Sequence, residues 1–221
     1  MKHPVLHRGA AALSLLLAAG GAWRALPAQV HPAATTLSPI PSNGAHAPAD
    51  TNHAGYTAGD VHFISGMILH HAQAILIAGW APTHDASAAL RALCERIVVG
   101  QRDEIVLFQR WLEQRHEAVP DYQHAMMPGM MDPTMMMPGM LTADQLSQLD
   151  HARGTEFDRL FLRFMIQHHQ GAITMVNQLF AAPGAGEEEN VYRYAANIFA
   201  DQTTEIERMQ HMLAAALFSD N

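Results

Sequence analysis

The chain has 221 residues, of which 49% are hydrophobic, so it can bury one substantial core and a single main domain is expected. Its formal net charge of −8 argues against a protein that binds nucleic acid or an anionic membrane surface. Cys94 is the only cysteine, which excludes an internal disulfide.

The N-terminus has the order of a secretory signal: Lys2 and Arg8, then an apolar run, then small residues. We predict a signal peptide over residues 1–28, cleaved after Ala22 or Ala28. The apolar run is short for a membrane span, and no later segment is expected to be long and apolar enough to cross a bilayer. The only membrane anchor considered is therefore an uncleaved signal. The mature protein is predicted to be exported, to the periplasm or to the extracellular space.

The next segment, residues 29–58, is rich in Ala, Pro, Thr, Ser and Asn. It is predicted to be a flexible leader, because so little apolar material cannot offset the cost of ordering the chain. A helical bundle is expected over residues 59–218. Its first helix is predicted to begin at Asp60, which can cap the N-terminus, and to end at Ala81, before Pro82.

The second helix is predicted from about Ser87 to Arg115, and the short break before it makes an antiparallel hairpin with the first helix. A methionine-rich segment follows at about residues 120–141. Its prolines and glycines are too closely spaced for a regular helix. We expect this segment to be a long loop.

The last helices follow from a second set of boundary signals. Thr142 opens a Thr-x-x-Gln capping box, which predicts a short helix that Gly154 is expected to end. Thr155 together with Asp158 is predicted to start the third main helix, which runs to about Phe180. The fourth helix follows three glutamates and continues to about Phe218. Strand-like alternation is absent from the sequence. We therefore predict an all-α fold of two similar hairpins, joined by a long Met-rich crossover.

One helical unit occurs twice in the chain. The motif Met-x-x-His-His begins at Met67 and returns at Met165, with acidic residues at matching positions before and after it. The corresponding pairs are Asp60 and Asp158, Met67 and Met165, His70 and His168, His71 and His169, and Glu104 and Glu205. Chemical groups that repeat together with a helix pair indicate a site between the two hairpins.

These residue types favour copper. Thioether sulfur selects Cu(I), and imidazole accepts copper and zinc, so many methionines beside histidines favour copper. Adjacent helical residues point about 100° apart. At most one histidine of each pair is therefore expected to aim at the bundle axis, the other lying between helices or at the surface. The predicted metal ligands are Asp60, Met67, His70, His71, Glu104, Met130, Met137, Met140, Asp158, Met165, His168, His169, Met175, Glu205 and Met209. The structural alternative is that the methionines fill the core and the histidines were duplicated for packing.

With Met137-Pro138-Gly139-Met140 ahead of the second Met-x-x-His-His unit, the chain resembles the family called domain of unknown function 305 over about residues 60–217. That family is similar to ferritin-like four-helix bundles and includes the CopM-type exported copper-binding proteins of bacteria. The resemblance implies copper binding and copper tolerance through histidine and methionine. In the first repeat Ile77 stands at the position equivalent to Met175, so the second repeat is better supplied with ligands.

The resulting interpretation is an exported copper-binding protein without catalytic activity. It would sequester copper ions or hand them over, with another copper-handling protein as a candidate partner. Two alternatives stay open at this point. One is a metal-dependent oxidoreductase of the ferritin-like type, and the other is an interaction module that binds no metal and docks a partner through its methionine-rich loop.

Overall fold

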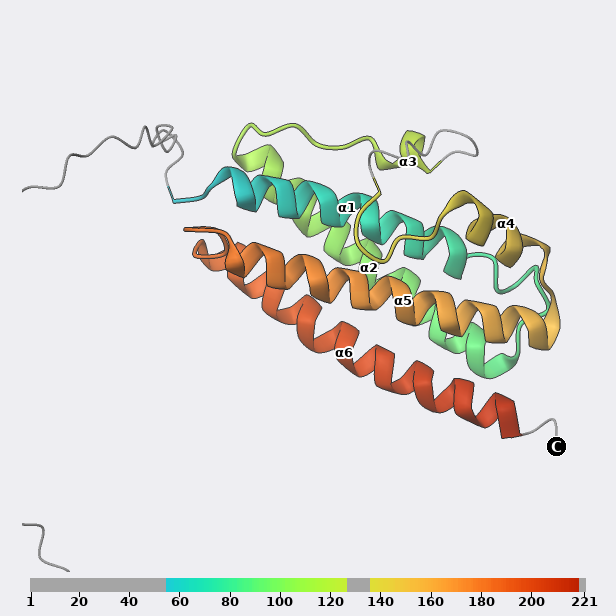
Figure 1. Cartoon of the computed structure of the whole chain (residues 1–221). Helices are drawn as coiled ribbons and strands as arrows, with labels where there is room; N and C mark the ends of the chain where they lie inside the picture. Colours follow the sequence, from blue (N-terminus) through green and yellow to red (C-terminus); the bar gives the residue numbers. More distant parts are fainter. Residues whose placement is uncertain (1–54, 127–135, 219–221) are drawn as a thin grey trace, which may run out of the picture. The chain divides into compact units, whose positions relative to one another are not determined.

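The computed structural model describes residues 55–126 and 136–218, and every regular element in these two ranges is a helix (Figure 1). The all-α prediction is confirmed. The four long helices are α1 (Ala58–Ala78), α2 (Ala88–Gln114), α5 (Gly154–Ala181) and α6 (Glu189–Phe218). The two short ones are α3 (Tyr122–Ala125) and α4 (Ala143–His151). The predicted signal peptide and nearly all of the predicted leader lie outside the described residues.

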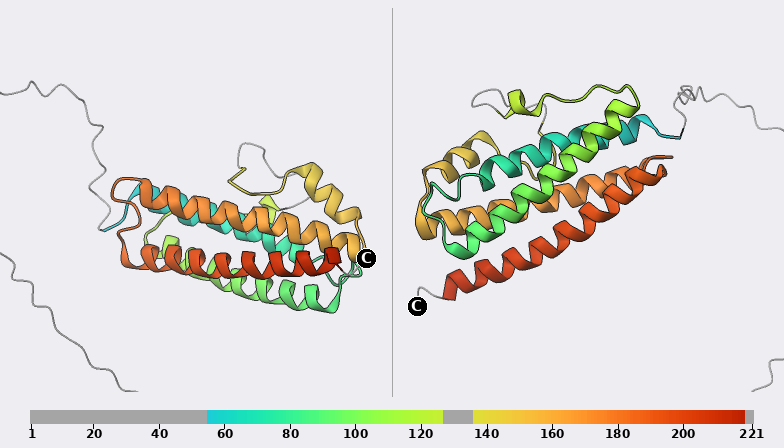
Figure 2. Two further views of the ribbon diagram at one scale, coloured as in Figure 1. Left: turned by 60° about the horizontal axis from the view of Figure 1, so that its bottom comes forward. Right: turned by 180° about the vertical axis from the view of Figure 1, so that it is seen from behind.

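The four long helices form two hairpins. Helix α1 packs against α2, and α5 packs against α6, while α1 and α5 bring the hairpins together (Figures 1 and 2). The connection between the hairpins carries two short helices: α3 lies on α1, and α4 lies on α5. The end of the methionine-rich segment therefore lies where α1 meets α5.

The start of α1 differs from the prediction by two residues. Thr57, not Asp60, is the N-cap, and the two residues form a capping box in which the Asp60 carboxylate accepts from the Thr57 backbone N–H at 2.7 Å. The same carboxylate accepts from the Gly186 N–H at 2.6 Å, which ties α1 to the turn between α5 and α6. At its other end α1 stops at Ala78, with Gly79 as its C-cap, and residues 79–85 form turns.

The boundary between α4 and α5 also corrects the sequence interpretation. The capping box of Thr142 with Gln145 is confirmed at the start of α4. Helix α4 ends at His151, however, and Gly154, with a φ of 57°, begins α5 instead of ending α4. Asp158 does not cap α5, because its carboxylate oxygens accept from the backbone N–H of Ser87 at 3.2 and 3.3 Å.

Helix α1 is long and apolar enough to cross a membrane by length and composition, with a mean hydropathy of 1.4 in its most apolar window. The expectation that no segment after the leader meets these criteria is therefore wrong. Burial gives the physical reason for the composition: 67% of that window is buried among the other helices. A helix with neighbours on several sides is apolar around most of its circumference.

Candidate metal centre

A polar layer crosses the middle of the four long helices and separates two hydrophobic clusters. On α1 the first cluster holds residues from Ala74 onward and the second holds residues up to Ala72. The same division falls between Met165 and Ala172 on α5. The paired histidines therefore lie at the boundary of the clusters on both helices. Gln101 and Glu104 on α2, and Gln202 and Glu205 on α6, occupy the same level of their helices.

All four histidines of the repeat are fully buried, with 0% of their surface exposed. The ring centroids of His70 and His168 are 3.8 Å apart, so the two hairpins meet through these rings. His71 and His169 turn toward the partner helix of their own hairpin. Two positions were expected for the second histidine of each pair, between helices or at the surface. His71 and His169 lie between helices, because α1 and α5 each have neighbours in both directions.

Three of the histidines are held through the same ring nitrogen. Nε2 of His71 lies 2.8 Å from Oε2 of Glu104, and Nε2 of His169 lies 2.6 Å from Oε2 of Glu205. Nε2 of His70 lies 3.0 Å from the carbonyl oxygen of Pro138. Carboxylate and carbonyl oxygens only accept, so each Nε2 carries the hydrogen and donates. In the neutral ring Nδ1 then keeps its lone pair.

Within residues 55–126 and 136–218 these lone pairs have no hydrogen-bond partner. Nδ1 of His70, His71 and His169 and both ring nitrogens of His168 are buried and unpartnered. Buried polar atoms are nearly always paired, and leaving one unpaired costs about 1–3 kcal/mol. Five such nitrogens lie in one layer, which makes this layer the candidate metal centre. A carboxylate or carbonyl on the opposite ring nitrogen is the usual support of a metal-bound histidine.

Burial keeps the central rings neutral. It lowers the pKa of His70 to about 3, and the neighbouring His71 acts in the same direction, while the bond to Pro138 opposes the shift. Burial also holds the pKa of His168 well below its ordinary value, again with a neighbouring histidine, His70, adding to the effect. Metals bind only the neutral imidazole, so these rings are ready to coordinate at neutral pH.

These pKa shifts predict that the metal-free protein loses stability in acid. In the unfolded chain His70 and His168 take up protons near pH 6.5, whereas the folded protein resists this until about pH 3 at His70. Below pH 6.5 the unfolded state therefore binds more protons, and the free energy of unfolding falls as the pH falls. Between pH 7.5 and pH 5 His70 alone should remove about 2 kcal/mol, and His168 should add to this loss, as measured by urea unfolding. Equal urea midpoints at the two pH values would contradict the buried neutral state.

The geometry limits how a metal can bind. Within the part of the chain that the structure describes, no group of three or more His, Cys, Asp or Glu side chains is arranged to hold one metal ion. The imidazole nitrogens therefore lie in one layer without meeting at a single point. Met67 and Met165 are also fully buried and come three residues before His70 and His168 on the same helices. Residues three apart share a helix face, so each thioether is expected on the same face as the ring of its helix.

The other predicted ligands lie in different places. The carboxylates of Asp60 and Asp158 are bonded at helix ends, and Asp60 is ten residues, or about 15 Å of helix, from His70. Met209 is buried in the cluster that contains Met165. Met140 is 5% exposed, and Met130 lies outside the described residues. The ligand predictions for these residues stay predictions, and the centre proposed below does not use them.

The end of the methionine-rich segment is fastened beside the histidines by groups that the sequence analysis missed. The side-chain amide of Gln73 donates to the Leu141 carbonyl at 3.1 Å and accepts from the Leu141 N–H at 2.7 Å. Gln167 donates to the Gly139 carbonyl at 3.2 Å. The available signal was the position of these glutamines, three residues after His70 and one residue before His168. Polar side chains beside a ligand motif are candidates for its support.

Gln101 and Gln202 were also missed as members of the polar layer, although they correspond in the repeat. They are 4% and 3% exposed. Among the residues that the structure describes, both amide atoms of Gln101 and the amide oxygen of Gln202 have no hydrogen-bond partner. They border a cavity of about 360 Å³ between α2 and α6, together with Glu104 and Glu205. The carboxylates therefore connect the buried rings with the side of the molecule between α2 and α6.

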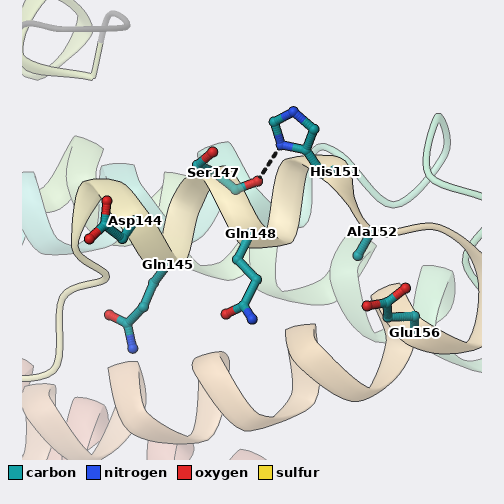
Figure 3. A pocket seen from close by; sticks show the side chains of 7 residues that line it. All are labelled: Asp144, Gln145, Ser147, Gln148, His151, Ala152 and Glu156. Carbon is teal, nitrogen blue, oxygen red and sulfur yellow. Dashed lines mark hydrogen bonds between the residues drawn. The ribbon is translucent and has the colours of Figure 1, made fainter.

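A further cavity, of about 590 Å³, lies along α4 and is lined by polar side chains (Figure 3). Its histidine, His151, is bonded through Nδ1 to the carbonyl of Ser147 on its own helix, at 2.7 Å. In Figure 3 the side chain of Gln145 points in a different direction, and it donates to Gln167 on α5 at 3.1 Å. The side chains along α4 do not gather around a common point, so this cavity is not a candidate centre.

This arrangement defines a class of protein: an all-helical fold that buries two repeated pairs of histidines. The chain belongs to the family Domain of unknown function (DUF305), whose family model matches residues 60–213. No functionally curated protein matches the chain.

Three solved structures with the same fold are informative. The Cu(II)-bound form of CopM is 29% identical, covers 71% of this chain and 96% of its own, and has a TM-score of 0.57. The Cu(I)-bound form of CopM is 28% identical over the same shares, with a TM-score of 0.54. A DUF305 fragment from Deinococcus radiodurans is 27% identical, covers 72% of this chain and 98% of its own, and has a TM-score of 0.60.

Proposed function

We propose that this protein is an exported copper-binding protein, a ferritin-like four-helix bundle that sequesters copper or hands it over. Membership in DUF305 and similarity to CopM, which has been solved with Cu(I) and with Cu(II), support this function. The similarity spans nearly the whole of CopM, so it concerns the complete helical fold and not a fragment. The signal-like N-terminus supports export.

The observation that carries the proposal is the set of unpartnered nitrogens on the four buried histidines. Each of His70, His71 and His169 has its Nε2 occupied by an oxygen acceptor and its Nδ1 free to coordinate. Most buried polar atoms are paired, and the buried histidine His84 has both ring nitrogens bonded to carbonyl oxygens. The carboxylates of Glu104 and Glu205 would then act on the metal through the rings, by fixing their orientation and raising the basicity of Nδ1.

The character of the centre favours Cu(I) as the bound form. Its donors are neutral imidazoles and, from Met67 and Met165, neutral thioethers, and all of them are buried. The cost of burying an ion in a medium of low dielectric constant grows with the square of its charge, so a monovalent cation is buried at lower cost. Thioether sulfur also prefers Cu(I). Two imidazoles, with sulfur nearby, would suffice for such an ion.

The oxidoreductase alternative is less well supported. Turnover needs an open coordination position and two accessible oxidation states, and buried neutral donors favour one state. An interaction module without metal would leave the buried nitrogens unexplained. We therefore propose a protein that binds copper without catalysing a reaction.

An anaerobic titration of the purified protein tests this function. We expect at least one equivalent of Cu(I) to be withdrawn from a colorimetric chelator, and the copper-loaded protein to consume neither oxygen nor hydrogen peroxide catalytically. Failure to compete for copper would refute the binding function. Sustained consumption of oxygen or peroxide would favour the oxidoreductase.

A further inference from the structure

A second set of soft donors lies outside the buried histidines, where α1, α5 and the end of the methionine-rich segment meet. It borders a cavity of about 130 Å³. His62 of α1, Met175 of α5, and Met137 and Pro138 of the crossover line this cavity. His62 is exposed, Met137 is half-buried, and Met175 is 8% exposed, so the cavity has an open side.

Gly66 brings the two methionines together. A Cβ atom at this position would lie 3.1 Å from Sδ of Met137 and 3.3 Å from Cε of Met175, so both thioether ends rest against the same bare backbone. His62 lies four residues earlier on α1 and thus on the same face of the helix. The equivalent position in the second repeat is Phe164. The two repeats therefore differ at this position, where the first has no side chain and both methionines pack against the backbone.

The chemistry of the lining selects its ligand. The donors are two thioether sulfurs and one imidazole, and none of the residues that line the cavity is charged at neutral pH when His62 is neutral. Soft, neutral donors favour Cu(I) or its analogue Ag(I) over divalent ions. Methionines also fill gaps in hydrophobic cores. Core filling alone, however, does not account for an open cavity with an exposed histidine beside them.

We infer that His62, Met137 and Met175 form a second, solvent-facing site for a soft monovalent cation, separate from the buried histidines. The site lies next to the buried centre, because Pro138 lines the cavity and its carbonyl oxygen also accepts the hydrogen bond from Nε2 of His70. The inference extends the proposed copper function from one centre to two. At this site an ion from solvent would first meet the protein. Met137 of the site is next in the chain to Pro138, whose carbonyl accepts from His70.

Titration with Ag(I) of protein carrying 13C-labelled methionine methyl groups tests the site directly. We expect the methyl signals of Met137 and Met175 to shift together as Ag(I) is added. The double variant Met137→Leu/Met175→Leu should bind one equivalent fewer than wild type, measured by native mass spectrometry. Methionine and leucine have similar volumes, so the variant should fold. His62→Ala should lower the affinity of this site for Ag(I) about tenfold or more, while the number of bound Ag(I) ions at saturation stays the same.

Two controls separate this site from the buried centre. Met212→Leu changes a half-buried methionine of α6 that packs against the other hydrophobic cluster and should leave Ag(I) stoichiometry unchanged. In the variant His70→Ala/His168→Ala the shifts of Met137 and Met175 should persist, even if the buried centre no longer binds. Methyl signals that stay in place in wild type, or that lose their response in this histidine variant, would overturn the second site. An undiminished stoichiometry in the leucine variant would overturn it as well.

Discussion

The variant His70→Ala/His168→Ala is expected to bind Cu(I) at the buried centre at least about 100-fold more weakly than wild type. The two rings, with centroids 3.8 Å apart, join the hairpins and carry three of the five unpartnered nitrogens. Loss of a supporting hydrogen bond alone typically lowers metal affinity about 10- to 100-fold, so loss of two candidate ligands should exceed that. Anaerobic competition with a colorimetric chelator measures the effect.

His84 offers a matched control, because it is a buried histidine whose two ring nitrogens both have hydrogen-bond partners. It is 5% exposed, and its Nδ1 and Nε2 each lie 3.0 Å from a backbone carbonyl oxygen, those of Trp80 and Asp150. His84→Ala should therefore lower the melting temperature without changing the affinity for Cu(I). If the double variant retains wild-type affinity, His70 and His168 have a packing role and the buried centre must be assigned to other residues.

The helices and their order could be predicted because their signals are local. The hydrophobic spacing, Pro82, Ser87 and the capping box at Thr142 each act within a few residues. The repeat added one long-range expectation, that the two histidine pairs would approach each other, and the contact of His70 with His168 agrees with it. Duplicated helices pack with duplicated faces, so a motif on one helix predicts the position of its copy.

The errors at the helix boundaries have local and long-range causes. Thr57 and Asp60 form a Thr-x-x-Asp pattern in which either residue resembles an N-cap, and only the backbone angles identify Thr57. A glycine with positive φ, such as Gly154, suits the end of one helix as well as the start of the next. The partner of Asp158 is the backbone of Ser87, 71 residues earlier, which no local pattern indicates.

The roles within the centre were harder to predict than its members. Glu104 and Glu205 were predicted as metal ligands, whereas the structure places their carboxylates on Nε2 of His71 and His169. Which atom of a carboxylate or an imidazole faces which neighbour depends on the register between helices. The sequence does not specify that register to within a residue. The contact of His70 with the Pro138 carbonyl could not be predicted either, because every residue has a backbone carbonyl and the sequence does not indicate which one will be the partner.

Gly171 of α5 touches Pro138, the residue whose carbonyl accepts the hydrogen bond from His70. A Cβ atom at Gly171 would collide with the carbonyl group of Pro138 and lie 2.6 Å from Cα of Gly139, so α5 and the crossover touch through bare backbone. Gly139 has a φ of 78°, a left-handed conformation that favours glycine. Neither backbone can yield easily, because Pro138, Gly139 and Leu141 are bonded to side chains of α1 and α5.

Gly171→Ala is therefore expected to destabilise the metal-free protein by about 2 kcal/mol or more, as an overpacked core does. The matched control is Gly100→Ala in α2, where no atom of the described residues lies within 4 Å of the added Cβ. That variant should gain about 0.5–1 kcal/mol, the usual benefit of alanine over glycine inside a helix. Urea unfolding of both variants measures the difference, and a Gly171→Ala protein as stable as Gly100→Ala would show that the crossover does not rest on α5.

Gly171→Ala should also change the copper centre, although it adds only a methyl group and removes no donor. The Pro138 carbonyl must move to admit the new Cβ, and its movement releases Nε2 of His70 from the bond that fixes the hydrogen on that nitrogen. The lone pair of Nδ1 is then no longer held in place, so Cu(I) affinity should fall about 10-fold or more while Gly100→Ala keeps wild-type affinity. A stable Gly171→Ala protein with unchanged copper affinity would show that the carbonyl of Pro138 does not support the centre, and would leave Glu104 and Glu205 as its only oxygen partners in the part of the chain that the structure describes.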